Sequence, residues 1–588
     1  MVGVTPGATT PDLELLLGDP HVPGPFDYAS ILEDDDARRL NAFAETVLTD
    51  WGAGAEFTPA RWGGRWIATD DLVTRLRPVF RRDPSVGLGY GLTTLMAAVT
   101  VWVAGSDDQK AATAARLLRG ERIAVGFHEI SHGNDLLHNE CRAIPAPGGW
   151  TVSGTKSVIN NVDRAQSVVI MARTRIDGPA ARQFSLLMWN KTPASLPHAD
   201  TAARVRTAGM RGCMIGAAQF DALPIPSTHV IGAEGTALET TLKAFQVTRA
   251  VIPALAVGSV EAALDESIRY ARERTLYGGR VLDIPHARSL FADALADTLA
   301  ADALSRAVVR GLHLTPRESF FLTAASKYLT PQLLNDAMQN LSVLAGSTFY
   351  ARVDPFGIVE KILRDIAVVP IGHAGSMACL STMVSHLAAW SRRSSSTAQT
   401  RRDLFDTEAL GPLDFAALGL GAGSSDPLGA ALTDPDILAL LSIEAPALVP
   451  LVEAAARHLD AQRALTSVLP PDAFTVDAAP EVFDIAVAIT QCLAAGAVVG
   501  TWAACRSTGG PLADPVIVEG CLRRLLSRRE NAPDPLPDAI IDRLVAHGER
   551  CVAASSSMGV DPVRLAQDAA APSPRPHTDR TETQEDPK

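Results

Sequence analysis

Hydrophobic and polar positions divide the chain into regions with a helical period and one region with the period of strands. Apolar residues recur at helical spacing along residues 32–51, 72–80, 87–103 and 107–118 and over long parts of 236–395, which predicts helices there. From 121 to 235, short runs rich in β-branched residues alternate with glycine and proline turns, a pattern typical of strands. The order of helices, strands and helices predicts a mainly α protein with a central β-domain, in the α+β class.

Helical periodicity returns after a polar, serine-rich and basic segment that runs from about Trp390 to Gly411. Such a composition favours an exposed linker. Helices are then predicted over residues 436–465, 479–506, 514–529 and 539–557. The predicted division is an N-terminal helical domain (1–120), a β-domain (121–235), a helical bundle (236–395), a linker (396–411), a C-terminal helical extension (412–570) and a disordered tail (571–588) that lacks apolar residues.

Composition excludes some function classes. The net charge of -13 over 588 residues makes nucleic acid an unlikely partner, because phosphate binding needs a clustered basic surface. Seven cysteines form no CxxC pair, which favours reduced thiols over a disulfide framework. No stretch is judged apolar enough to span a bilayer, and the N-terminus lacks the basic and hydrophobic regions of a signal peptide. We therefore expect a cytoplasmic protein with no membrane partner.

The segment around His128-Glu129-Ile130-Ser131-His132 is compatible with two different chemistries. On a helix, His128 and His132 would share a face and bind zinc while Glu129 activates a water molecule, with His138 as a third ligand. However, Gly126 precedes the motif and Gly133-Asn134-Asp135 follows it, and glycines so placed break a helix. The motif is thus predicted to lie on a loop, and a zinc hydrolase is the less favoured interpretation.

The same segment and the strands after it resemble the acyl-CoA dehydrogenase family. Residues 128–135 are similar to that family's TEPxxGSD loop, Trp150 to Lys156 to its WxxxGxK strand, and Ile159-Asn160-Asn161 to the turn that follows. Residues 209–226 are similar to the run that closes its β-domain, and Lys361 to Asp365 matches its Arg-Asp motif. The order of helices, sheet and helices is part of the resemblance.

The resemblance implies that FAD binds at a dimer interface. In the family, the loop and the turn lie against the flavin ring, and here Asn160 is expected to donate a hydrogen bond to the flavin. An arginine at the position of Arg274 reaches the pyrophosphate of the neighbouring subunit, although an arginine there also suits a helix C-terminus. In the family, a turn approaches the adenosine half of FAD, and the matching residues here include Ser342 and Gly346. Gly346 is the only one of the family's glycines that this chain has in the turn. The candidate cofactor residues are His128, Asn134, Ile159, Asn160, Arg274, Tyr277, Ser342 and Gly346.

The catalytic base departs from the family. Its members place a glutamate at one of two positions, and here these are occupied by His373 and Thr248. Histidine acts as a base near neutral pH, so His373 is the candidate base, with a structural imidazole in a shortened turn as the alternative. Glu129 is the second catalytic candidate.

The resemblance implies an FAD-dependent oxidoreductase acting on CH-CH groups. We expect α,β-desaturation, or a related oxidation, of an acyl thioester carried by CoA or by an acyl carrier protein, with electrons passed to an acceptor. A non-redox or flavin-repurposed thioester enzyme on the same fold is the alternative. Some larger family members carry an extension that covers the surface used for tetramer formation, so a homodimer is expected.

Overall fold

The computed structural model describes residues 12–201, 204–353, 355–392, 400–528 and 535–567. Its N-terminal part is helical, as expected, but residues 32–51 form two helices instead of one. Arg38 has a positive φ of 54° that ends the first of them, and the side chain of Asn41 caps the second by accepting a hydrogen bond from the Ala44 amide. The helices are α1 (Leu13–Leu17), α2 (Tyr28–Asp36), α3 (Ala42–Trp51), α4 (Thr69–Arg82), α5 (Pro84–Gly87), the π-helical turn η3 (Leu88–Leu92), α6 (Thr93–Ala104) and α7 (Asp107–Leu118).

The glycines of residues 87–91 allow close packing, as the sequence indicates. A Cβ atom on Gly87 would lie 2.6 Å from the Phe80 ring, and one on Gly91 would lie 2.8 Å from the Phe57 ring. The turn η3 itself was not expected. A π-helical turn is often found at a functional site, and this one faces the β-domain.

The central region forms one mixed sheet. Its strands are β1 (Ile123–Gly126), β2 (Arg142–Ala146), β3 (Gly149–Asn160), β4 (Ser167–Arg173), β5 (Phe184–Asn190), β6 (Ala199–Asp200), β7 (Ile215–Pro226) and β8 (Val230–Ile231). The order is β6-β7-β3-β2-β4-β5-β8, and β1 pairs with β4 in parallel. The register between β3 and β7 shifts between Lys156 and Ile159, and Asn160 at the end of β3 then contacts Leu88 of η3.

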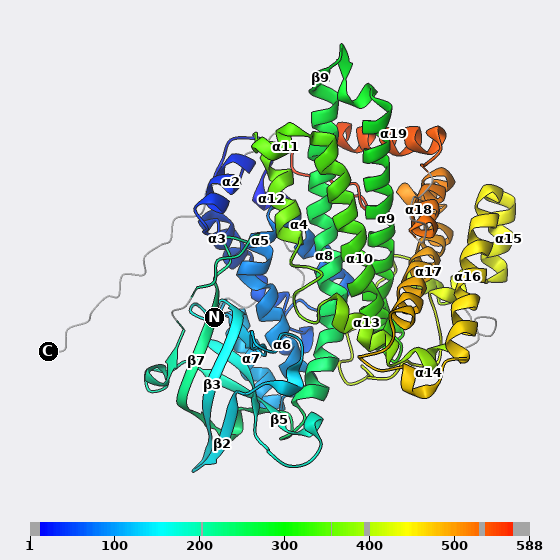
Figure 1. Cartoon of the computed structure of the whole chain (residues 1–588). Coiled ribbons are helices and arrows are strands. Elements are labelled where there is room, and N and C mark those ends of the chain that lie inside the picture. Colours follow the sequence, from blue (N-terminus) through cyan, green and yellow to red (C-terminus); the bar gives the residue numbers. More distant parts are fainter. Residues whose placement is uncertain (1–11, 202–203, 354, 393–399, 529–534, 568–588) are drawn as a thin grey trace.

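The helical bundle follows the sheet and stands above it in Figure 1. It contains α8 (Ala237–Glu273), α9 (Pro285–Leu314), α10 (Ser319–Ala345), α11 (Ser347–Ala351), α12 (Gly357–Ile366), α13 (Ser376–Val384) and α14 (Leu387–Ser391). A two-stranded hairpin, β9 (Thr275–Leu276) and β10 (Gly279–Arg280), projects from its far end. Pro285 opens α9, where its missing amide hydrogen does no harm.

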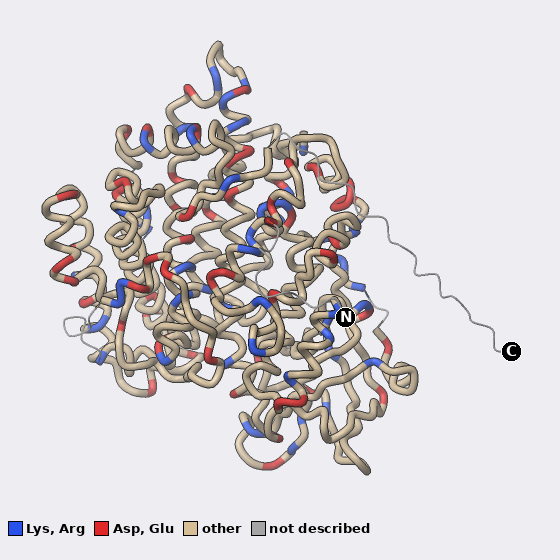
Figure 2. Tube along the Cα trace, turned by 180° about the vertical axis from the view of Figure 1, so that it is seen from behind, with Lys and Arg blue, Asp and Glu red and all other residues tan. Residues whose placement is uncertain are grey.

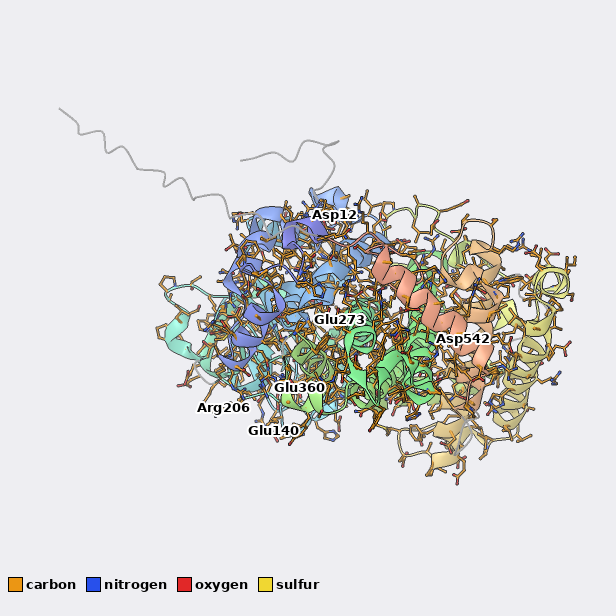
Figure 3. All side chains as sticks on the ribbon, turned by 90° about the horizontal axis from the view of Figure 1, so that it is seen from above. Asp12, Glu140, Arg206, Glu273, Glu360 and Asp542 are labelled. Carbon is orange, nitrogen blue, oxygen red and sulfur yellow. The ribbon has the colours of Figure 1, made fainter. Side chains whose placement is uncertain are left out.

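The C-terminal extension covers the side of the bundle opposite the N-terminal helices, as seen from above in Figure 3. Its helices are α15 (Pro435–Glu444), α16 (Val449–Ser467), α17 (Pro480–Cys505), α18 (Pro515–Ser527) and α19 (Asp538–Ala553), and α17, α18 and α19 all contact α9. An extended segment, residues 555–567, then returns to the bundle. There the Val560 amide donates a 2.8 Å hydrogen bond to Asp302.

Part of the predicted linker, residues 396–411, packs against the bundle. Leu404 and Phe405 are buried, and Asp406 forms a 2.9 Å ion pair with Arg310 of α9. These contacts hold Leu404, Phe405 and Asp406 against the bundle, whereas residues 407–409 are exposed. Residues 393–399 and the predicted disordered tail, 571–588, lie outside the described residues.

Among the residues that the structure describes, three helices are long and apolar enough to cross a membrane by length and composition, so the expectation that no stretch qualifies is wrong. They are Pro84–Ala104, Ala237–Glu273 and Pro480–Cys505, and the most apolar window of each is 83%, 100% and 78% buried inside the protein. A helix that is apolar on all sides is typical either of a membrane span or of the centre of a large core.

Charged residues of both signs are interspersed over the surface in Figure 2. Many form ion pairs between elements, for example Arg288 of α9 with Asp542 of α19 at 2.6 Å.

Candidate functional site

A cavity of about 310 Å³ lies where the β-domain, the turn η3 and the bundle meet. This volume is at the lower end of the range for small-molecule sites. The walls are mostly apolar, with Phe80, Leu92, Val125, Ile215, Ile252 and Ala256 among them. The polar residues that line the cavity are His128, Glu129, Asn134, Asn160, Lys327 and His373, together with Thr93 and Ser259.

His373 lies in the turn between α12 and α13, as the sequence register predicts. Both His373 and Ala374 have positive φ angles, 45° and 59°, a conformation that costs free energy for residues other than glycine. The turn is held because the amide and hydroxyl of Ser376 donate to the Pro370 carbonyl at 2.8 and 3.1 Å. Nδ1 of His373 is buried without a hydrogen-bond partner. Burial, with the nearby His128 and Lys327, lowers the pKa of His373 well below its usual value.

His128 and His373 both line the cavity, and their rings are in edge-to-face contact. The two ring centroids lie 5.6 Å apart, and the rings are nearly perpendicular at 79°. The Ser157 amide donates to the His128 carbonyl at 2.9 Å, which fixes the loop against β3. Burial, and then the charge of Lys156, lower the pKa of His128. Two neutral imidazoles thus face one another inside apolar walls.

The loop that carries His128 does not form the zinc site of the alternative interpretation. His132 and His138 have ring centroids 6.4 Å apart, and His132 instead approaches Glu140 at 3.6 Å. Of the residues that the structure describes, one group of histidine, cysteine and carboxylate side chains has metal-like spacing, namely His21 with Asp265 and Glu266. The His-Glu-x-x-His residues are not in that group, because the glycines after the motif prevent the helix that would align them.

Glu129 lines the cavity, but its carboxylate is fully engaged. It accepts hydrogen bonds from Lys156 at 2.8 Å, from the Glu140 amide at 2.8 Å and from the Cys141 amide at 3.0 Å. Burial alone would raise the pKa of Glu129, yet Lys156 and these amides outweigh it and lower the pKa. The geometry therefore assigns Glu129 to holding the loop against β3 and disfavours it as a base.

Asn160 is at the cavity, but its hydrogen-bonding role differs from the one expected. Its amide group donates to the Leu88 carbonyl at 3.0 Å and to the Thr93 hydroxyl at 3.1 Å, while its Oδ1 is buried without a partner. It can therefore accept a hydrogen bond from a ligand but has no free N–H to donate. Ile159 points the other way, into the β-domain core at 1% exposed, and Val158, with a positive φ of 56°, lines the cavity in its place.

The remaining cofactor candidates lie at the other end of the bundle. Arg274 and Tyr277 belong to the exposed hairpin after α8, where Tyr277 is 98% exposed. Ser342 and Gly346 lie at the end of α10, and α11, which follows, is joined to α8 by a hydrogen bond between Thr348 and Tyr270. None of the four lines the cavity of their own chain.

Sequence reasoning missed two buried cations beside the cavity. Lys327 of α10 is 1% exposed and lines the cavity, where its ammonium group donates to the Val369 carbonyl. Burial, and also the charge of Arg249, lower the pKa of Lys327 to about 8. Arg249 of α8 is 2% exposed and lies between the rings of Phe245 and Phe320, at 5.9 Å from each. The only signal was a lysine within the apolar sequence FFLTAASKYL.

Comparisons with known proteins fit this architecture. Residues 237–385 match the model described as acyl-CoA dehydrogenase, C-terminal domain. Isovaleryl-CoA dehydrogenase from Oryza sativa subsp. japonica is 24% identical over 327 residues, which cover 55% of this chain and 78% of that protein. Butyryl-CoA dehydrogenase from Megasphaera elsdenii superposes with a TM-score of 0.56 at 18% identity, over 60% of this chain and 92% of the other. The prolyl acyl carrier protein oxidase AnaB gives 0.58 at 17% identity, over 64% and 96%.

Proposed function

We propose that the chain is a member of the acyl-CoA dehydrogenase family and that it is an FAD-dependent oxidoreductase that oxidises an acyl thioester between its α and β carbons. The observation that carries the proposal is the cavity in which His128 and His373 face each other at 5.6 Å. The cavity combines apolar walls with a buried histidine, His373, at the sequence position where the family resemblance implies a catalytic base.

The residues present fit a flavin ring. Asn160 offers a buried acceptor, Oδ1, that has no partner, and a flavin ring carries an N–H group that can donate to it. His128 and Asn134 lie on the same wall, and Arg274 of a second subunit would neutralise the pyrophosphate. The bound flavin would supply a hydride acceptor, which is chemistry that no side chain provides.

The proton must then be taken by a residue of this chain. Thr248 is buried, and its hydroxyl donates to the Phe245 carbonyl, while the carboxylate of Glu129 is occupied. His373 remains, with a free Nδ1 and a lowered pKa that keeps it neutral at physiological pH. A neutral imidazole can accept the α-proton, and the apolar walls exclude water from the transfer.

The experiment begins with the visible spectrum of the purified protein and continues with flavin bleaching after anaerobic addition of thioester. We expect His373→Ala and His373→Gln to retain flavin and to bleach about 100-fold or more slowly. In the wild type the rate should rise with pH through a lowered imidazole pKa and stay level across neutral pH. Bleaching by His373→Ala at the wild-type rate would show that His373 is structural. Protein that stays colourless even after FAD is added would favour the non-redox alternative.

CoA and a carrier protein are both proposed carriers of the substrate, and likeness to AnaB supports testing the second. The homodimer, the cytoplasmic location and an electron acceptor also remain proposals. Light scattering at several concentrations tests the dimer, and a tetramer mass would contradict it. The way the extension covers α9 supports the prediction that it prevents a larger assembly.

A further inference from the structure

Lys327 and Arg249, which we call the cavity cations, lack the negative charge that buried cations need. Neither forms an ion pair with a carboxylate among the described residues. The Lys327 ammonium group has three donors, and one hydrogen bond is observed, to the Val369 carbonyl. Nε and Nη1 of Arg249 are buried without a partner. An unpaired buried charge is costly, so a bound anion would relieve a real deficit.

Other buried basic side chains in the described structure are matched. Arg77 pairs with Asp302 at 2.7 Å, Arg81 with Glu14 at 2.7 Å, and Lys156 with Glu129 at 2.8 Å. The lack of a carboxylate partner is therefore local to the cavity cations and is not a general property of the protein interior.

The position of the cavity cations indicates which part of a ligand they face. Lys327 lines the same cavity as His373, and its charge is close enough to lower the pKa of His373. Arg249 does not line the cavity, but the Phe245 ring that it contacts lies 6.5 Å from the His373 ring. An anion bound at Lys327 would thus lie near His373, in a cavity whose walls are mostly apolar.

We propose that Lys327, reinforced by the charge of Arg249, forms a subsite for a carboxylate carried on the acyl group itself. The substrates of this protein are then thioesters of dicarboxylic acids, with the free carboxylate bound at Lys327 and the thioester placed toward His373. This inference rests on the proposed function, because it takes the cavity to hold an acyl thioester. A carboxylate also suits the geometry, since its two oxygens can accept the two unused donors of Lys327.

The test compares two ligands of equal chain length, glutaryl and valeryl thioesters of N-acetylcysteamine, so that neither CoA nor a carrier protein influences the result. Isothermal titration calorimetry on the full chain as purified should show that the glutaryl thioester binds roughly tenfold or more tightly. Lys327→Met should abolish this preference and Lys327→Arg should retain most of it. Lys327→Gln replaces the methionine variant if that variant does not fold.

Lys191→Met is the matched control. Lys191 also donates to a backbone carbonyl, that of Val162, and burial also lowers its pKa, but it lies in the β-domain and does not line the cavity. Its replacement should leave the preference unchanged.

The proposal is overturned if the wild type binds both thioesters equally or neither, or if the preference persists in Lys327→Met. It is also overturned if Lys327→Met slows bleaching by both thioesters alike without changing affinity, because Lys327 would then stabilise the enolate and not a carboxylate. A preference without any flavin bleaching would refute the oxidoreductase and leave the subsite. Bleaching without a preference would refute the subsite alone.

Discussion

Lys361 and Lys327 are equally buried, at 1% exposed each, yet their surroundings are opposite. The ammonium group of Lys361 contacts Asp83 at 2.5 Å and Asp365 at 2.7 Å, whereas Lys327 has a single backbone carbonyl. The first arrangement joins α12 to the N-terminal helices. The second lies at a cavity. Burial of a charge therefore does not reveal its role, but the presence or absence of a counter-charge does.

The difference between the two lysines is tested most directly by removing each ammonium group in turn. Lys361→Met should lower the free energy of unfolding by about 3–5 kcal/mol, because Asp83 and Asp365 would be left buried without a cation. Lys327→Met should change it little or raise it, since no acid loses a partner. Urea unfolding of both variants measures the difference. Equal losses would mean that Lys327 has a hidden partner and would remove the basis of the carboxylate subsite.

The pH dependence of stability is a second test of the difference between Lys327 and Lys361. Burial lowers the pKa of Lys327 from 10.5 to about 8, so the penalty for its charge is complete below pH 8 and is relieved as the pH rises toward 10.5, by up to about 3 kcal/mol. For Lys361, burial acts to lower the pKa, but Asp365 and Asp83 raise it above the usual value. Its stabilisation is complete below pH 10.5 and is lost above that.

Unfolding free energies at pH 7.5 and 10 provide the measurement. The difference between Lys327→Met and the wild type should shrink with rising pH. Parallel curves for the two proteins would contradict the lowered pKa of Lys327.

Asn160 is a neutral group with the same kind of difference. Its side-chain N–H groups have hydrogen-bond partners, but its Oδ1 has none. Asn160→Ala should cost about 1–3 kcal/mol, because the Leu88 carbonyl and the Thr93 hydroxyl lose their donor. It should also weaken flavin binding. Asn134→Ala is the control, as Asn134 is an exposed loop residue and should have a smaller effect on stability. Equal thermal stability of Asn160→Ala and the wild type would argue that the turn η3 does not depend on this contact.

The smallest effect on stability is expected for Arg274→Ala. Arg274 is exposed at the base of the hairpin, so its removal should change the free energy of unfolding by less than about 0.5 kcal/mol. The flavin content of the purified variant should nevertheless fall sharply if the arginine reaches the partner's pyrophosphate. A full complement of flavin would remove Arg274 from the cofactor site.

Local sequence patterns were sufficient for most of the fold. The glycines around His128 predicted a loop, and the alternation of apolar and polar positions predicted the β-domain. The position of His373 came from the family resemblance, counted from the Arg364-Asp365 motif, and the structure brings that residue to the cavity. The loop and the strands depend on residues close in sequence, so their patterns can be recognised from one sequence alone.

The features that were missed depend on distant neighbours. Whether Asn160 donates or accepts is decided by Leu88 and Thr93, about 70 residues away, and by a π-helical turn that no periodicity indicated. The burial of Lys327 depends on how α8, α10 and the segment after α12 pack together. Neither property is carried by the residues beside it in the sequence.

The return of residues 555–567 to the bundle has a consequence for how the protein is made. Asp302 pairs with Arg77 and also accepts the amide hydrogen bond of Val560, and Gly559 lies so close that a Cβ there would meet Glu261 at 2.1 Å. The N-terminal helices, the bundle and the end of the extension therefore share one set of contacts. During synthesis, this set can be completed only after residues 555–567 have left the ribosome, so we expect the N-terminal helices and the bundle to reach their final packing only after the extension has been made.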